Sequence, residues 1–575
     1  MFRKNDQHLQ TPIFSSLFDL PDKEKERLSQ SWAATFYEAC FCRIDEDIFS
    51  ILYSDKASRP NVPVNVLVGL EIMKSGFGWS DAELEDALHF NLQVRYALGY
   101  SSLDKGHFEL RTVYNFRNRL TRHMQETGEN LLEEVFEQIT DEQIAALKLK
   151  TGKMRMDSTQ IASNIRQMSR LQLLVEVLHR VWRMLDEEAQ AIYEEMFKAY
   201  VENTSGQYVY HIQSGEGQQH LEAMGHVMRQ LVNELAKDYQ DEMAYQVLTR
   251  VYGEHFVEVE SGLRPKVGKE LSAQSLQSPD DWEATYRKKN GKGYKGYVTN
   301  VTETCAPDND LQLIVKVQTE ANNVDDADML NNAVPNLVER ADVNELHTDG
   351  GFNSDAVDVR LNDESIEQFQ TAIRGKKNKK SDDAPLNVSD FVFVSNKKGI
   401  PQTVRCPQGQ QVAVRSARKE ERFTALFEQA TCATCPLLSK CPTDLLRRKP
   451  KRVLRFSQKQ VNIARRCENQ RKAKASGRNL RSAVEATVRS VKHPFGNGKL
   501  PVRGKRRVSM MMIASAAMTN VRRIWRYNIA KNTTKSGKIT EKQGAKPAEA
   551  SCFLLELRPL FRFQATQRQC QPLAA

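Results

Sequence analysis

The sequence lacks long apolar runs, and cysteine is scarce in it. The longest mainly apolar stretch, Val508 to Val521, is too short and too interrupted to span a bilayer. The N-terminal residues are followed by no apolar run of the length that a secretion signal needs. Ten cysteines among 575 residues do not make the disulfide framework of a small secreted protein. We therefore expect a cytoplasmic protein without a membrane span.

Acidic residues are nearly missing from one long segment. Between Arg447 and Arg526 the chain has 24 lysines and arginines against two acids, Glu468 and Glu485, and its total net charge is +10. Such a basic segment suggests a polyanionic partner, of which nucleic acid is the commonest. The alternative is a basic linker without structure. Apolar residues at helical spacing within the segment favour a folded, nucleic-acid-binding one.

The length and the apolar pattern predict several units in the chain. Its length suggests three or four domain-sized parts. Residues 1–145 are predicted to form a helical domain, because their apolar residues recur at helical spacing. This domain would bind DNA or form a dimer. A second helical region at 165–262 and a cysteine-bearing segment at 376–460 are predicted insertions in a domain at 146–530. From 531 to 575 we expect a disordered tail.

Between the helical regions, the sequence predicts the strands of a mixed α/β sheet. The stretch "KMRMDST" alternates apolar and polar residues, as an extended strand does. The stretches "GYVTNVTETC" and "LQLIVKVQTEA" flank a polar turn and predict a hairpin. A helix at 325–341 and a short strand "ELHT" follow. The order strand, hairpin, helix, strand is typical of a mixed α/β domain.

Three acidic residues occupy notable positions in these predicted elements. Asp157 is expected to close the first strand, Asp349 to close the strand after the helix, and Glu485 to lie in the basic helical region. Gly350 and Gly351 follow Asp349, and such small residues let a metal ion and a phosphate approach the backbone closely. For Asp157 the alternative is a helix cap or a turn.

Four cations would surround Glu485 if the last basic region were one continuous helix. At about 100° per residue they fall within about 40° of Glu485, beside an apolar stripe; they are Arg478, Arg481, Arg489 and Lys492. An arginine four residues before a glutamate is also an ordinary surface pair. Since other acids are scarce there, we favour a site that holds phosphates and a metal ion together. Glu468 is the rival third acid, but it lacks a lysine at the same spacing.

These motifs, in this order, resemble a known family. "MRMDSTQ", "HTDGGF" and the spacing Arg481-x3-Glu485-x6-Lys492 resemble bacterial insertion-sequence DDE transposases of the YREK type, in the insertion-sequence 1182-like group. The flanking segments "SDAELEDALHF" and "RGKRRVSMMMIASAAMTNVRRI" are also similar to helical parts of that family. The signature tyrosine would fall at Arg478, so its role does not carry over to this chain.

The resemblance implies a fold, an activity and the roles of several residues. It implies an RNase H-like catalytic core in which Asp157, Asp349 and Glu485 hold two Mg²⁺ or Mn²⁺ ions, with Asp157 bridging both. Arg481 and Lys492 would contact phosphates near the site.

The resemblance further implies a bacterial enzyme that cleaves the inverted-repeat ends of its element and joins them to double-stranded target DNA. It would act as a homodimer in the synaptic complex, associated with the nucleoid. A nuclease or resolvase of the same fold without strand transfer is the alternative function. An inactive, domesticated DNA-binding protein is the second alternative, although the intact acids count against it.

The cysteines form a second pattern. Cys406, Cys432, Cys435 and Cys441 have the spacing C-x25-C-x2-C-x5-C. Thiolates at C-x2-C spacing can hold one tetrahedral zinc ion. We therefore predict a structural Zn²⁺ site that stabilises the insertion at 376–460. Four unliganded thiols are the alternative.

Overall fold

The computed structural model describes residues 1–541 apart from a few short segments. The segments left out are 11–14, 16–18, 55, 57–59, 261, 290, 373–384, 397, 418–420, 476 and 478. One compact unit, Met1–Trp525, contains all the elements discussed below except the end of the last helix. That helix, α19 (Lys505–Glu541), includes residues expected to belong to the tail. Residues 542–575 lie outside the described part.

The N-terminal region is helical, as predicted. Its helices are α1 (Asp22–Ser29), α2 (Trp32–Ala39), α3 (Val64–Phe77), α4 (Asp81–Phe90), α5 (Leu92–Ala97), α6 (Leu110–Glu126) and α7 (Leu131–Leu147). The α4 helix begins with a complete capping box, in which Ser80 and Glu83 satisfy each other's backbone amides. Short 3-10 helices elsewhere span Gln7–Leu9, Phe41–Arg43, Glu46–Leu52, Val388–Asp390, Leu438–Lys440 and Gly496–Gly498.

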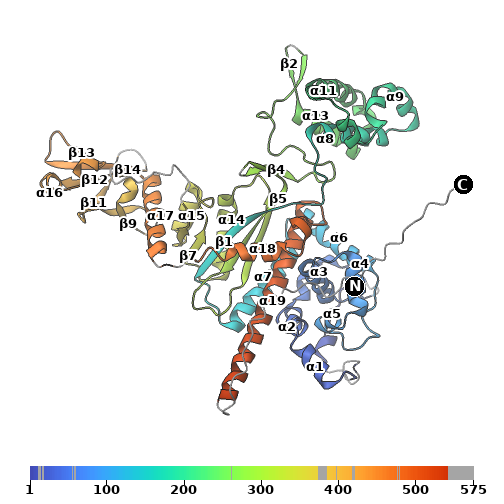
Figure 1. Cartoon of the computed structure of the whole chain (residues 1–575), viewed down its shortest axis with the longest axis horizontal. Coiled ribbons are helices and arrows are strands. Elements are labelled where there is room, and N and C mark those ends of the chain that lie inside the picture. Colours follow the sequence, from blue (N-terminus) through green and yellow to red (C-terminus); the bar gives the residue numbers. More distant parts are fainter. Residues whose placement is uncertain are drawn as a thin grey trace. The chain divides into compact units, whose positions relative to one another are not determined.

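A six-stranded mixed sheet lies at the centre of the unit (Figure 1). Its strands are β1 (Lys153–Ile161), β4 (Thr285–Lys289), β5 (Lys292–Thr304), β6 (Ile314–Ala321), β7 (Glu345–Thr348) and β8 (Glu367–Gln370). The order is β4-β5-β1-β7-β8, and β6 also pairs with β5. β5 is antiparallel to β1, β4 and β6, whereas β7 is parallel to β1 and β8. The predicted strand, hairpin, helix and strand are confirmed.

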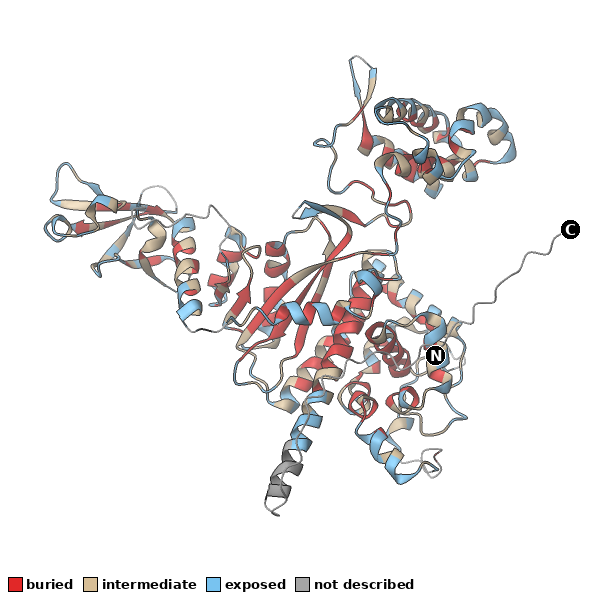
Figure 2. Cartoon of the chain, in the orientation of Figure 1, coloured by how far each residue is buried: buried red, intermediate tan, exposed pale blue. Residues whose placement is uncertain are grey.

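Apolar residues pack against this sheet in two large clusters. One cluster joins β1, through Met154 and Met156, to α14 (Asp326–Arg340) and α15 (Asp355–Asp363). The other joins Ile161, Tyr297 and Val301 to the N-terminal helices and to α19. Figure 2 shows the buried strands and the buried first half of α19. The N-terminal helices therefore share a hydrophobic core with the sheet that carries the predicted acids.

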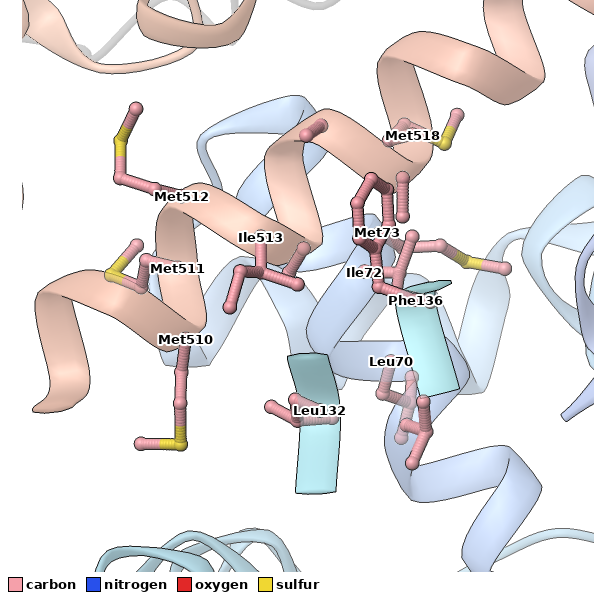
Figure 3. Packing of buried hydrophobic residues seen from close by; sticks show 14 of the residues in the cluster. Leu70, Ile72, Met73, Leu132, Phe136, Met510, Met511, Met512, Ile513 and Met518 are labelled. Carbon is pink, nitrogen blue, oxygen red and sulfur yellow. The ribbon is translucent and has the colours of Figure 1, made fainter. Parts of the chain in front are cut away.

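The close approach of α19 to the N-terminal helices depends on a glycine. Met511, Ile513 and Met518 of α19 belong to the same cluster as Met73 of α3 (Figure 3). A β-carbon on Gly76 would lie 2.3 Å from the β-carbon of Met518, so no larger residue fits between the two helices without a shift. The second half of the basic region is thereby tied to the first hundred residues.

Two further folded regions adjoin the central sheet, one after β1 and one after β8. The helical one contains α8 (Arg170–Met184), α9 (Glu187–Val201), α10 (Ser205–Tyr210), α11 (Gly217–Glu234), α12 (Ala236–Tyr239) and α13 (Met243–His255). These helices have a core of their own. The hairpin of β2 (Phe256–Val259) and β3 (Gly262–Pro265) follows them.

The cysteine-bearing insertion is an antiparallel sheet. Its strands are β9 (Val392–Ser395), β10 (Pro401–Arg405), β11 (Gln411–Ser416), β12 (Arg422–Glu428), β13 (Asp444–Leu445) and β14 (Lys451–Ser457), with α16 (Gln429–Ala433) between β12 and β13. The order is β13-β14-β12-β11-β10-β9. The sheet has a small separate hydrophobic core.

The last basic region is not one continuous helix. α17 (Gln458–Ala475) and α18 (Val484–Lys492) are separate, and between them Gly477 has a backbone φ of 67°. The prediction that placed four cations around Glu485 assumed one continuous helix. That assumption was wrong for the residues before Val484, because a left-handed glycine ends a helix. In the part of the chain that is described, no helix is long and apolar enough to cross a membrane.

Candidate active site

Asp157 of β1 lies near Asp349, which follows the end of the neighbouring parallel strand β7. Arg155 of β1 pairs with His347 of β7, so the residues two positions further along each strand face each other beyond the end of β7. Asp349 follows the last residue of β7, as predicted. Asp157 does not close β1, which continues to Ile161 against β5. That prediction was wrong because the partner β5 is long, and pairing with it extends β1 beyond the carboxylate.

Asp157 is a buried carboxylate in a mixed electrostatic environment. Its side chain accepts a hydrogen bond from the backbone N–H of Ser158, at 3.0 Å. Burial raises the pKa of Asp157 most, the guanidinium of Arg481 lowers it, and the negative charge of Asp349 raises it further. The net shift is upward. The ionised form of a carboxylate in this setting is stabilised when a second positive charge binds beside it.

Arg481 connects two of the predicted acids. Its Nη2 lies 3.0 Å from Oδ2 of Asp157, and its Nη1 lies 3.2 Å from Oε1 of Glu485. Glu485 is largely exposed, with 65% of its side-chain surface accessible, whereas the Arg481 side chain is mostly buried. Arg481 therefore forms the surface pair with Glu485 and, through the same guanidinium, also pairs with Asp157. The site that holds phosphates and a metal ion stays a prediction.

A buried ionic network holds α18 against the sheet and so places Glu485. Glu303 of β5 is fully buried. Its carboxylate accepts hydrogen bonds from Arg155 Nε at 2.6 Å, from Thr487 Oγ1 at 2.7 Å and from Arg523 Nη1 at 2.7 Å. Arg155 also donates to the carbonyl of Leu480, at 2.8 Å. Strands β1 and β5 and helices α18 and α19 are joined at this single carboxylate.

The other cations predicted around Glu485 are arranged differently. Lys492 donates to Thr159 Oγ1 at 3.1 Å and to the carbonyl of Gln160 at 2.8 Å, both on β1. Burial lowers the pKa of Lys492. Arg489 is exposed on α18, and Arg478 lies outside the described residues. Of the cations whose placement is described, only Arg481 is paired with Glu485; Lys492 lies along the strand of Asp157 instead.

The carboxylate chemistry of this site fits a hard divalent cation. Mg²⁺ and Mn²⁺ prefer oxygen ligands, and Asp157, Asp349 and Glu485 supply them. No three His, Cys, Asp or Glu side chains among the described residues are arranged to hold a metal ion as they stand. The positive charge between Asp157 and Glu485 belongs to Arg481.

Comparison with known proteins identifies two segments of the chain. Residues 405–525, which include Arg481 and Glu485, match the family model described as transposase DDE domain. Residues 30–119 match the transposase domain DUF772. Together, the two matches support a bacterial insertion-sequence DDE transposase. The pairing of the two domains is consistent with the insertion-sequence 1182-like group. Neither a curated protein nor a solved structure matches it significantly.

The transposase has a further carboxylate in this site that sequence analysis missed. Asp326, in the first turn of α14, is buried, and its Oδ1 accepts a hydrogen bond from Ser158 Oγ at 2.8 Å. A β-carbon on Gly351 would lie 3.0 Å from Asp326 Oδ2 and 3.0 Å from Asp349 Oδ1. Asp326 therefore lies close to Asp349 and is hydrogen-bonded to Ser158, the residue that follows Asp157. In the sequence, its only signal was an acid in the first turn of a helix, which the helix dipole alone explains.

The cysteines of the transposase come together in the second sheet. Cys406, Cys432, Cys435 and Cys441 line one cavity, and all four are free thiols. Burial raises the pKa of Cys432, and the neighbouring thiols raise it further. Thiolates would relieve this repulsion by sharing a zinc ion, so the donor set fits the predicted Zn²⁺. Among the described residues these thiols are not arranged to hold a metal ion, so the zinc site stays a prediction.

Proposed function

We propose that the transposase cleaves DNA at the inverted-repeat ends of its element and joins those ends to target DNA, using Mg²⁺ or Mn²⁺. The observation that carries this proposal is the pairing of Asp157 with Arg481, which also contacts Glu485. Asp349 lies nearby, directly after the neighbouring strand β7. Strand pairing and Arg481 thus connect acids from three distant segments of the chain, and phosphodiester chemistry uses such a set of acids.

The strand order supports an RNase H-like core. An antiparallel run of β6, β5 and β1 is followed by the parallel strands β7 and β8. Asp157 lies on β1 and Asp349 directly after β7, and the third acid lies on α18, a helix packed against the sheet. The resemblance stated from the sequence implies this same order of elements.

The roles of the chain's own residues follow from their positions. Asp157, Asp349 and Glu485 would hold the divalent ions, and Asp326 would support them through Ser158. The bound ions would activate the attacking oxygen and stabilise the leaving oxygen. Arg481 would turn from the acids to a DNA phosphate, because arginine binds phosphate with a fixed pair of donors. Lys492, and exposed Arg489, would bind neighbouring phosphates, as would Arg478.

The remaining parts would serve assembly and DNA capture. The N-terminal helices and the helical insertion at 165–262 would bind the element's ends or a second protomer, and two protomers would pair the two ends in a synaptic complex. The enzyme would work in the bacterial cytoplasm and associate with the nucleoid when bound to DNA.

One assay tests the activity. Purified transposase, Mg²⁺ and labelled DNA that carries the terminal repeats are expected to yield both cut ends and joined products. Asp349→Asn should lower cleavage by at least about a thousandfold and leave binding of the ends intact, because the amide keeps the shape and loses the charge. Cleavage without joining would support a nuclease or resolvase. If the wild type binds DNA but does not cleave it, and Asp349→Asn binds equally well, the result would support a domesticated DNA-binding protein.

A separate measurement tests the structural zinc. The purified protein should contain about one zinc per chain by elemental analysis, and Cys432→Ser should lose it. The matched control is Cys467→Ser, a cysteine on α17 outside the cavity, which should keep its zinc. If the purified protein contains no zinc, and a chelator does not change its unfolding temperature, the four thiols are unliganded and the zinc prediction is wrong.

A further inference from the structure

A strongly basic hairpin extends from the edge of the catalytic sheet. The strands β4 and β5 pair at their adjoining ends, from Thr285 opposite Gly296 to Lys289 opposite Lys292. We call residues 285–289 and 292–296, the paired parts of β4 and β5, the basic hairpin. It contains no acid, and its cations are Arg287, Lys288, Lys289, Lys292 and Lys295. We propose that the basic hairpin binds the phosphate backbone of the DNA strand that enters the active site, an inference that rests on the proposed function.

The pairing register separates the side chains of the basic hairpin onto two faces. Residues directly opposite each other in a sheet share a face, and neighbours along a strand alternate. Arg287 is opposite Tyr294, and Lys289 is opposite Lys292. These four residues therefore share one face, which we call the cationic face. Tyr286, Lys288, Gly293 and Lys295 share the other face.

The face opposite the cationic face is anchored to the protein. Lys295 donates from Nζ to the carbonyl of Met168 at 2.8 Å, and the backbone N–H of Tyr286 donates to the carbonyl of Ala273 at 2.9 Å. A β-carbon on Gly293 would lie 2.8 Å from the Tyr286 ring, so the glycine makes room for that ring. The basic hairpin is thus held from one side by the segments that flank the helical insertion.

The cationic face adjoins Asp326, the buried acid beside the candidate catalytic acids. Nη1 of Arg287 lies 3.9 Å from Oδ1 of Asp326, and Nη2 lies 3.7 Å from Oδ1 of Asp325. That oxygen of Asp326 also accepts the hydrogen bond from Ser158, the residue next to Asp157. Lys289 and Lys292 follow Arg287 along the hairpin, away from the acids. A strand whose phosphate reached Asp157 would meet this row of cations on its way.

The charges on the basic hairpin carry an energetic cost that a purely structural hairpin would avoid. Lys289 and Lys292 are directly opposite each other, and like charges in this position destabilise a sheet. Both are exposed, and within the described residues neither has a carboxylate partner. The ammonium of Lys292 lies over the ring of Tyr294, 5.5 Å from its centroid. Cations beside an aromatic ring suit a nucleic-acid strand, because they neutralise phosphates while the ring can stack on a base.

The salt dependence of DNA binding tests the inference. The variant K289A/K292A is compared with wild type by fluorescence anisotropy on terminal-repeat DNA extended beyond the cleavage point, without divalent ions. Loss of two phosphate contacts should lower the slope of log affinity against log salt by about 1.8. K289R/K292R should keep the wild-type slope.

The matched control changes the same charge at the other end of the sheet. K148A/K150A removes two exposed lysines that precede β1, where no acid of the active site lies. This control should keep the wild-type slope. A slope of K289A/K292A equal to that of K148A/K150A would overturn the inference.

A measurement on the wild type guards against a misfolded variant. Bound DNA should protect Lys289 and Lys292 from acetylation, read by mass spectrometry, more than it protects Lys148 and Lys150. Equal modification with and without DNA would also overturn the inference. If the wild type cleaves its ends while the slope and the protection are unaffected, the hairpin inference alone fails. If slope and protection change as expected but the wild type cuts no DNA, the proposed function alone fails.

Discussion

The guanidinium of Arg481 lies 3.0 Å from the carboxylate of Asp157. The same guanidinium reaches Glu485, so one positive charge lies between two acids that the proposed chemistry assigns to metal ions. Arg481 Nε is buried and has no hydrogen-bond partner within the described residues. A side chain with one unsatisfied donor can leave this position at less cost than one with every donor satisfied. We therefore expect Arg481 to hold the acids together in the absence of metal and to compete with a bound metal ion for them.

Replacing Arg481 should strengthen binding of a divalent cation. Arg481→Ala removes the competing charge, and we expect the affinity for Mn²⁺ to rise about tenfold, equivalent to about 1.4 kcal/mol. The signal of free Mn²⁺ in electron paramagnetic resonance measures this. Arg489→Ala, on the exposed side of α18, serves as control and should leave the affinity unchanged. Weaker Mn²⁺ binding by Arg481→Ala would show that Arg481 organises the acids and does not compete for them.

Asp157 should make the protein less stable as pH rises. Burial raises its pKa in the folded state, so the folded protein holds this proton more tightly than the unfolded chain does. The stabilisation is complete below the unfolded pKa of about 3.9 and is lost as pH rises through the folded pKa. Asp157→Asn resembles the protonated form at every pH. We expect it to unfold at a higher temperature than wild type at pH 7, with the difference shrinking towards pH 4.

Calorimetry of both proteins from pH 4 to pH 8 measures this difference. Glu485→Gln is the comparison, because its carboxylate is largely exposed and should give no comparable gain at pH 7. A destabilised Asp157→Asn at neutral pH would mean that the ion pair with Arg481 outweighs the burial of the carboxylate.

Asp326 should influence the metal requirement of the reaction. It is buried beside Asp349 and accepts the hydrogen bond of Ser158, next to Asp157. Residues that support metal ligands typically change affinity 10- to 100-fold when altered. Asp326→Asn should therefore raise the Mg²⁺ concentration for half-maximal cleavage at least about tenfold. Asp325→Asn, one residue earlier and 68% exposed, is the matched control. Identical Mg²⁺ curves for the two variants would assign Asp326 to helix capping alone.

Glu303 should be critical for stability. It is fully buried between Arg155 and Arg523, and its removal leaves two guanidiniums without their common partner. Breaking a buried ionic group in this way costs about 3–5 kcal/mol. Glu303→Gln should lower the free energy of unfolding in urea by about that amount, whereas Glu339→Gln on the exposed side of α14 should change it little. If both variants changed the free energy of unfolding equally, Glu303 would not be the residue that holds α18 against the sheet.

Much of the sheet was predictable because strand and helix periods are local properties. The alternation in β1 and β6, the capping box before α4 and the glycines after Asp349 are each readable within about ten residues. The break at Gly477 was missed. A single glycine within a helical pattern is tolerated often enough that periodicity alone does not exclude a continuous helix.

By itself, the sequence determined the mixed α/β class, the helical and cysteine-bearing insertions, and the acids Asp157, Asp349 and Glu485 as candidates. Only the tertiary structure decided that Asp157 lies within its strand, that Arg481 joins it to Glu485, and that Asp326 lies beside Asp349. The physical reason is range. Apolar periodicity acts between neighbours in the chain, whereas strand register and ion pairs depend on segments that folding brings together from far apart.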